Sequence, residues 1–171
     1  PKKNVPRTLK AYALYRKRSK DPLPLLIADI RDDILTTLLK ELKIEDIRPF
    51  IFSPGYIPNT DLPHLYSGSF AFLYTSLRES FGIPLLEAMA CGTPVVTSNT
   101  SSMPEIGGTD ALLSDPTNEE DITNKLLLLE NNPMIYRQQV DYGLDRAKLF
   151  SWENTAQNLL SIYQHIKSQK I

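Results

Sequence analysis

The sequence predicts an α/β fold, a parallel sheet with helices on both faces. Short apolar runs of strand length alternate along the chain with segments of helical spacing. Parallel strands need long connections, which such helical segments supply. The 171 residues, 42% of them hydrophobic, fit the size and composition of one globular domain. We therefore expect a single domain over residues 1–171.

The first predicted elements are a surface helix, a buried strand and a second helix. Apolar residues recur at helical spacing among Lys and Arg over Val5–Arg18. Pro22 and Pro24 break the chain before Leu25–Ala28, a continuous apolar run that is typical of a strand covered on both faces. A helix is predicted next, over Asp32–Leu42.

A second strand and a short helix follow. The apolar residues of Pro49–Phe52 predict the strand, and Ser53–Tyr56 after it has turn chemistry. Asp61 or Thr60 can cap a helix that continues through Leu65.

The middle of the chain predicts strands at Phe70–Tyr74 and Pro94–Thr97, with a helix from about Pro84 to Cys91 between them. Gly92 follows that helix, at a position where a residue with positive φ is favoured. A weaker fifth strand is predicted at Ala111–Leu113.

The rest of the chain is predicted to be helical, over Asn118–Glu130, Pro133–Phe150 and Ser151–Lys167. Proline suits the first turn of a helix and serine suits an N-cap, so the second and third of these segments begin with residues typical of helix starts. Trp152 is expected to pack the last helix onto the sheet.

Charge and cysteine content exclude several classes of protein. Lys and Arg number 19 and Asp and Glu number 20, so the net charge of -1 favours neither nucleic acid nor an acidic membrane surface as a partner. Cys91 is the only cysteine, which excludes an intrachain disulfide and a cysteine-rich metal site.

The apolar runs are too short to cross a bilayer, and the first residues lack the apolar core of a signal peptide. We expect a cytoplasmic protein without a transmembrane segment.

The most informative stretch begins with the loop after Tyr74. Pro84 can begin the following helix without losing a hydrogen bond, so the amides before it stay free. The free donors are those of Ser80, Phe81, Gly82 and Ile83. A helix N-terminus with free amides binds phosphate or sugar oxygens, and in a parallel sheet it lies at the edge where ligands bind.

Two carboxylates flank this helix start. Glu87 lies one turn into the helix within an apolar run, where an unpaired buried carboxylate would be costly and a bound diol would satisfy both oxygens. Glu79, eight residues earlier on the loop, can reach the other end of the same ligand. A lone Glu on a helix is more often solvated or structurally paired. A ligand-binding role for the two glutamates therefore depends on the residues around them.

That pattern resembles the donor-site signature of the retaining glycosyltransferases with two Rossmann-like domains, family 4 of the GT-B fold. Two Glu are separated by seven residues, with Phe-Gly and Pro between them and Ala-Met-Ala-Cys-Gly-Thr-Pro-Val-Val after them. Ser101–Ile106 and Ala111–Pro116 continue the pattern. Lys3-Asn4 before the first helix and Phe150-Ser151-Trp152 before the last are similar to the two ends of the family's C-terminal domain.

The resemblance implies transfer of a hexose from a UDP- or GDP-linked sugar to an acceptor hydroxyl, with retained configuration. Glu87 would bind the ribose hydroxyls and Glu79 the donor sugar. Lys3, which would otherwise be a solvated terminal lysine, would neutralise the departing diphosphate. The loop amides would contact sugar and diphosphate. Tyr56 and Ile57 stand where the family's backbone binds the base, although ordinary loop packing explains them equally well.

The resemblance also implies what lies outside these residues. No cofactor and no essential metal is expected, because Lys and helix-end amides take the place of Mg²⁺. The first strand of the domain and an N-terminal acceptor domain of the same chain would precede residue 1, and that domain could bring the protein to a membrane surface. The 171 residues are expected to bind the donor without turnover. Asp29, where many relatives have glycine, puts a contact between its turn and the diphosphate in doubt.

Two other functions stay open. A module that binds a nucleotide sugar without catalysis could keep both glutamates. A signalling receiver domain is suggested by Asp29, Asp32 and Asp33 after an early strand. Against it, the third predicted strand does not end in Asp and the fifth contains no Lys.

Overall fold

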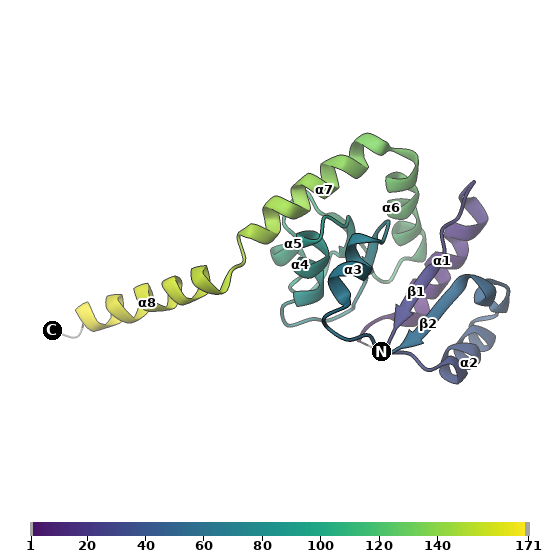
Figure 1. Cartoon of the computed structure of the whole chain (residues 1–171), viewed down its shortest axis with the longest axis horizontal. Helices are drawn as coiled ribbons and strands as arrows, with labels where there is room; N and C mark the ends of the chain where they lie inside the picture. The colour runs from purple at the N-terminus through teal and green to yellow at the C-terminus, as the bar shows by residue number, and fades with distance from the viewer. Residues whose placement is uncertain (1, 170–171) are drawn as a thin grey trace.

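The computed structural model describes residues 2–169 and has an α/β fold of parallel strands flanked by helices (Figure 1). Its strands form two sheets. β1 (Leu25–Ala28) pairs with β2 (Ile51–Gly55), and β4 (Val95–Ser98) lies between β3 (Phe72–Tyr74) and β5 (Leu112–Ser114). Each of these pairings is parallel, which confirms the predicted fold class.

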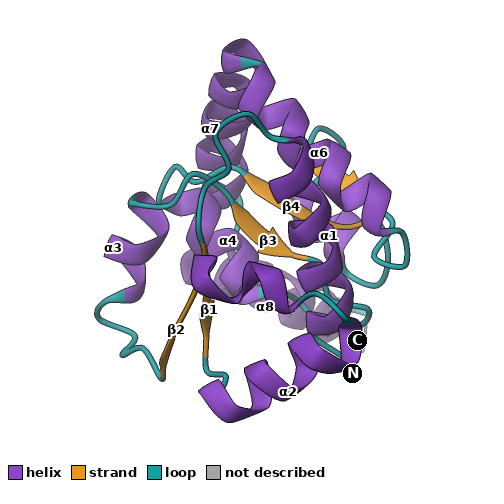
Figure 2. Cartoon of the chain, turned by 90° about the vertical axis from the view of Figure 1, so that its right-hand side faces the viewer, coloured by secondary structure: helices purple, strands orange, loops and turns teal. Residues whose placement is uncertain are grey.

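Helices connect successive strands and lie on both faces of the larger sheet (Figure 2). They are α1 (Val5–Arg18), α2 (Asp32–Leu42), the 3-10 helix η1 (Glu45–Phe50), α3 (Leu62–Ser67), α4 (Ile83–Ala90), α5 (Met103–Gly107), α6 (Glu119–Asn131), α7 (Pro133–Lys148) and α8 (Trp152–Ser168). Neither η1 nor α5 is among the predicted elements. None of the helices between residues 2 and 169 combines the length and the hydrophobicity that a membrane crossing needs.

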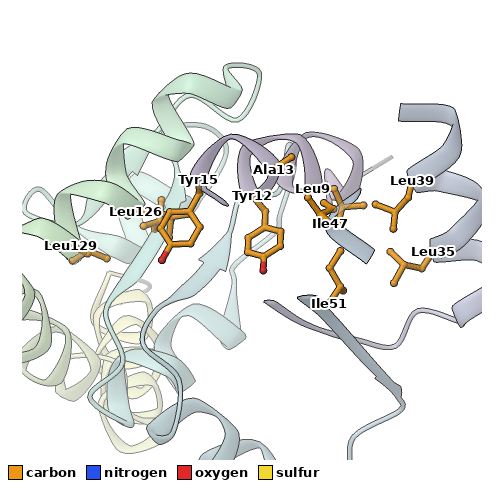
Figure 3. Packing of buried hydrophobic residues seen from close by; sticks show 11 residues of the cluster. Leu9, Tyr12, Ala13, Tyr15, Leu35, Leu39, Ile47, Ile51, Leu126 and Leu129 are labelled. Atoms are coloured by element: carbon orange, nitrogen blue, oxygen red, sulfur yellow. The ribbon is translucent and has the colours of Figure 1, made fainter. Parts of the chain in front are cut away.

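Two hydrophobic clusters hold the helices against the sheets. The first contains Leu9 of α1 and Leu129 of α6 (Figure 3). The second contains Leu85 of α4. β4 separates them, because Val95 belongs to the second cluster and its neighbour Val96 to the first. The strand at the centre of the larger sheet is therefore covered on both faces, which fixes the loops at its end.

The smaller sheet is covered less completely than the sequence predicts. Leu26 in β1 is 41% exposed and its register partner Phe52 in β2 is 60% exposed. The prediction that Leu25–Ala28 is covered on both faces is therefore wrong. β2 also continues through Ser53–Gly55, where a turn was expected, because a strand at the edge of a sheet tolerates Pro54.

α8 leaves the body of the protein, and none of its residues that the structure describes is buried (Figure 1). Trp152 at its start is 81% exposed, so the prediction that this ring packs the last helix onto the sheet is wrong. The predicted N-cap is confirmed, since the hydroxyl of Ser151 accepts a hydrogen bond from the amide of Asn154 at 3.0 Å. Local capping fixes where α8 begins, whereas its apolar residues contact no core.

Candidate functional site

The loop between β3 and α4, residues 75–82, forms the centre of the predicted site. Gly82 precedes α4 with a φ of 107°, a conformation that favours glycine, and a Cβ there would clash with Cε of Met103 unless that side chain moved. Pro84 lies in the first turn of α4, as predicted. Within residues 2–169, no protein acceptor receives the loop amides of Ser80, Phe81, Gly82 and Ile83. Four donors are thus free at the start of one helix.

Lys3 and Glu79 meet beside this loop. Nζ of Lys3 lies 2.6 Å from Oε1 of Glu79 and donates to the hydroxyl of Tyr74 at 3.2 Å. The ammonium is also 5.1 Å from the centre of the Tyr74 ring, within range of a cation–π interaction. The side chain of Glu79 is 17% exposed and that of Lys3 is 61% exposed. The carboxylate is therefore the sheltered partner and the ammonium the solvent-facing one.

The local contacts favour the charged form of both groups. Partial burial would raise the pKa of the Glu79 carboxyl, but hydrogen bonds from Lys3, Ser76 and Tyr74 outweigh it and lower that pKa. Partial burial likewise opposes the charged form of Lys3, but its hydrogen bonds to Glu79 and Tyr74 raise the pKa of the amine overall. At neutral pH the site therefore presents an ammonium beside a carboxylate.

Asn4 fixes the segment that carries Lys3. Asn4 is 3% exposed and has a left-handed φ of 57°. Its side-chain amide donates to the carbonyl of Thr75 at 3.0 Å and to that of Pro116 at 2.6 Å. Both partners lie far along the chain, so the sequence shows Asn4 only as the neighbour of Lys3 before the first helix and does not indicate this anchoring role. The structure adds it as the anchor that brings Lys3 to the loop.

Glu87 lies on α4, one turn beyond the free amides. Its side chain faces solvent, so the burial cost that its apolar neighbours suggest does not arise. Within the described part of the chain it makes no ion pair, and the hydroxyl of Tyr66 donates to its Oε2 at 3.4 Å. Burial, together with the negative charge of Glu87, raises the pKa of Tyr66 to about 12, so this hydroxyl stays a donor. Glu87 is therefore open to a ligand.

A row of three aromatic rings runs between the two acidic residues. Phe72 meets Tyr66 edge to face at a centroid distance of 5.2 Å and stacks with Tyr74 at 5.5 Å. The hydroxyl at one end of the row contacts Glu87 and the hydroxyl at the other contacts Lys3 beside Glu79. The row, from α3 and β3, was not predicted as part of the site.

Tyr56 and Ile57 follow β2 in the smaller sheet, apart from the loop at α4. The ring of Tyr56 is 75% exposed, and neither side chain contacts the other candidate residues through a hydrogen bond within residues 2–169. In the neighbouring turn, the amide of Asp29 donates to the carbonyl of Gly55 at 2.8 Å. That amide is therefore already used, which agrees with the doubt that this turn contacts a diphosphate.

The ring of Phe81 contacts the segment that follows α7. It packs edge to face on Phe150 with the ring centroids 6.0 Å apart, and the guanidinium carbon of Arg146 lies 4.9 Å from the centre of the Phe150 ring. In residues 2–169 no group of three or more His, Cys, Asp or Glu side chains is arranged to hold a metal.

Residues 1–146 match the family model described as "Glycosyl transferases group 1". The chain is also 36% identical over 167 residues to O-antigen chain mannosyltransferase B of Escherichia coli. That match covers 96% of this chain and 43% of the relative, so the chain spans less than half the length of that protein.

Solved structures share the fold. The C-terminal domain of LpcC, a glycosyl transferase group 1 family protein from Francisella tularensis, matches with a TM-score of 0.74 and 24% identity, covering 86% of this chain and 78% of that one. Alr3699/HepE of Anabaena, solved in complex with UDP and glucose, matches with a TM-score of 0.75 and 16% identity, covering 91% of this chain and 44% of that one. At these identities the likeness establishes the architecture alone.

Proposed function

The chain belongs to the Glycosyl transferases group 1 family, and we propose that it is the donor-binding domain of a retaining glycosyltransferase of family 4. The whole protein then transfers a hexose from a UDP- or GDP-linked sugar to an acceptor hydroxyl. The name of the E. coli relative, a mannosyltransferase, supports sugar transfer. The UDP and glucose bound by HepE support a nucleotide sugar as the donor.

The observation that carries this proposal is the ion pair of Lys3 and Glu79 beside free amides at a helix start. A donor sugar presents hydroxyl donors, which a carboxylate accepts, and a diphosphate, which cations and helix-end amides stabilise. One small region thus supplies complements to both halves of the donor.

In the proposed reaction, Lys3 stabilises the negative charge that develops on the diphosphate as the bond to the sugar breaks. Its side chain is 61% exposed, so the ammonium can turn toward a phosphate. The side chain of Glu79 is only 17% exposed, so its carboxylate stays sheltered beside the loop, where the sugar hydroxyls would lie. No essential metal is needed if Lys3 and the loop amides of Ser80, Phe81, Gly82 and Ile83 supply the positive charge.

The nucleoside is assigned to the other end of the site. We propose that Glu87 binds the ribose hydroxyls, which its exposed carboxylate and lack of an ion pair within residues 2–169 support. Tyr56 and Ile57 would contact the base through their backbone. Their place after β2, on a different sheet from the loop, fits a ligand that spans the two sheets.

The acceptor site and the rest of catalysis are proposed to lie in a second domain of a longer protein that acts in the cytoplasm, with any membrane contact made through that domain. The length of the E. coli relative, of which this chain covers 43%, supports a second domain. The split into two sheets, with open edges at β1 and β3, supports a further parallel strand between them. The 171 residues alone would then bind the donor without transferring the sugar.

Calorimetric titration of the chain with UDP and with GDP tests the proposal. We expect saturable binding of one of the two nucleotides in a 1:1 ratio. No heat from either nucleotide at millimolar concentration would remove the donor-binding function. Competition by the matching nucleotide sugar would show that nucleotide and donor share the site.

A further inference from the structure

The hydroxyl of Ser101 holds both backbone groups of Glu79. Oγ of Ser101 donates to the carbonyl of Glu79 at 2.7 Å and accepts from its amide at 3.1 Å. Both polar groups of this residue's backbone are thus satisfied by one side chain that is 22 positions away. The conformation of the residue that carries the carboxylate is set from the turn before α5.

Ser102 extends this contact along the loop. Its hydroxyl lies 3.1 Å from the carbonyl of Glu79 and 3.0 Å from that of Phe81, and its single proton is shared between the two oxygens. The two serines therefore hold two carbonyls of the loop, those of Glu79 and Phe81, toward the same side.

This arrangement has a consequence for the amides. The C=O and N–H of a trans peptide point in opposite directions, and the described chain contains no cis peptide. The carbonyl of Glu79 shares its peptide with the amide of Ser80, and the carbonyl of Phe81 shares its peptide with that of Gly82. Because both carbonyls face the serines, both amides face away from them. The serines thus fix the orientation of both peptides, so that one side of the loop presents its amide donors and the other side its carbonyl acceptors.

Ser101 makes these bonds from an unusual backbone conformation. Ser101 has a φ of 61°, a left-handed conformation that glycine adopts most readily and that costs other residues about 1 kcal/mol. Serine occupies this position in spite of that cost, and its hydroxyl makes both hydrogen bonds to the backbone of Glu79. The turn is also anchored from behind, because Arg146 of α7 donates to the carbonyls of Glu105 and Ile106 at the end of α5.

We propose that Ser101 and Ser102 are positioning residues for the donor, acting through the loop. Their hydroxyls hold the carboxylate of Glu79 where it meets the sugar and aim the amides of Ser80 and Gly82 at the diphosphate. This inference rests on the proposed donor-binding function and names two residues that never touch the reacting atoms.

The test compares ligands that do and do not reach the loop. The variants are Ser101→Gly, which removes the hydroxyl at a φ that glycine favours, and Ser102→Ala. The ligands are GDP-mannose and UDP-glucose, each matched with GMP or UMP, and the affinities are measured by calorimetry on the full chain. We expect each variant to lose about tenfold in affinity for the sugar nucleotide and less than about twofold for the monophosphate.

Two controls separate positioning from general damage. Ser102→Thr keeps a hydroxyl at an ordinary φ of -79° and should restore the affinity for the sugar nucleotide. Thr100→Ala removes an exposed hydroxyl from the same turn that bonds to no described residue, and should leave both affinities unchanged. A merely structural role would lower the affinity for sugar nucleotide and monophosphate alike.

Amide hydrogen exchange gives a readout without a ligand. The amide of Glu79 should exchange slowly in the wild-type chain and at least tenfold faster in Ser101→Gly, because its hydrogen bond is lost. Unchanged exchange, or wild-type affinity for the sugar nucleotide in both variants, would overturn the positioning role while the donor-binding function stands. A wild-type chain that binds none of these ligands at millimolar concentration would overturn both.

Discussion

The ammonium of Lys3 and the carboxylate of Glu79 lie 2.6 Å apart, although 76 positions separate the two residues in the sequence. The contact joins the segment before α1 to the loop before α4. It assembles two opposite charges, one sheltered and one exposed, before any ligand is bound. Each half of the pair can be tested separately.

Replacing Lys3 by Ala should lower the affinity for UDP or GDP about tenfold and that for UMP or GMP less than about threefold, because we propose that the ammonium stabilises the diphosphate. The fold should lose less than about 1 kcal/mol of stability, since ion pairs with an exposed partner contribute little. Calorimetry and urea unfolding measure the two effects. Lys2→Ala, the neighbouring exposed lysine, is the matched control. An equal loss for both classes of nucleotide would contradict the assignment of Lys3.

The contribution of the ion pair to stability should depend on pH at both extremes. The pKa of Glu79 is lowered from 4.5, so the stabilisation is present above that value and is lost as the pH falls through the lowered pKa. The pKa of Lys3 is raised from 10.5, so the stabilisation is complete below that value and is lost as the pH rises through the raised pKa. The midpoint temperatures of thermal unfolding of wild type and Glu79→Gln should therefore differ by a constant amount between about pH 5 and about pH 10. In acid the two midpoint temperatures should converge. A difference in midpoint temperature that grows in acid would refute the stabilising role of the ion pair.

Glu87 should control the preference for ribose. The wild-type chain should bind UDP or GDP about tenfold more tightly than the corresponding 2′,3′-dideoxy nucleotide, because a carboxylate accepts from both hydroxyls. Glu87→Ala should bind the two forms equally well. Glu41→Ala, an exposed glutamate of α2, should keep the preference. If Glu87→Ala still discriminates tenfold, the ribose is bound elsewhere.

Gly82→Ala should destabilise the fold more than Gly55→Ala. Both positions have a positive φ, 107° and 80°, so both substitutions strain the backbone. The new Cβ at Gly82 also meets Cε of the buried Met103, whereas that at Gly55 meets nothing within 4 Å. We expect Gly82→Ala to cost about 1 kcal/mol more in urea unfolding. Equal losses would mean that Met103 moves aside freely.

Removing α8 should leave the stability of the body nearly unchanged. No residue of α8 that the structure describes is buried, so little apolar surface is exposed when the helix is removed. A chain that ends after Phe150 should unfold within about 0.5 kcal/mol of the full chain in urea. A loss of several kcal/mol would mean that α8 packs against the body in solution.

Local signals made much of the fold predictable. The starts of α6, α7 and α8 follow from Asn118, Pro133 and Ser151, because a cap or an N-terminal proline acts within a few residues. The open face of β1 was not predictable in the same way. A continuous apolar run such as Leu25–Ala28 reports hydrophobicity, whereas its covering depends on which elements pack over it. The exposure of Trp152 has the same cause.

The site residues also differ in whether the local sequence made them predictable. Glu79, Glu87 and the free amides could be proposed because they lie within nine consecutive residues that combine a loop, a proline and a helix start. Asn4 and Ser101 could not, since their bonds to the site cross 71 and 22 positions of sequence. Hydrogen bonds across such distances exist only after the sheet has formed.

The rings of Tyr66, Phe72 and Tyr74 form a continuous row of contacts, which would mechanically couple the two recognition tasks proposed for its ends. A substitution that shifts one ring should displace the hydroxyls beside both Glu79 and Glu87. A change that adapts the site to a new nucleoside would then also disturb the binding of the sugar, and a change that adapts it to a new sugar would disturb the binding of the nucleoside. Changes of specificity in this lineage should therefore accumulate at solvent-facing side chains such as Ile83, which is 55% exposed, while the rings themselves stay fixed.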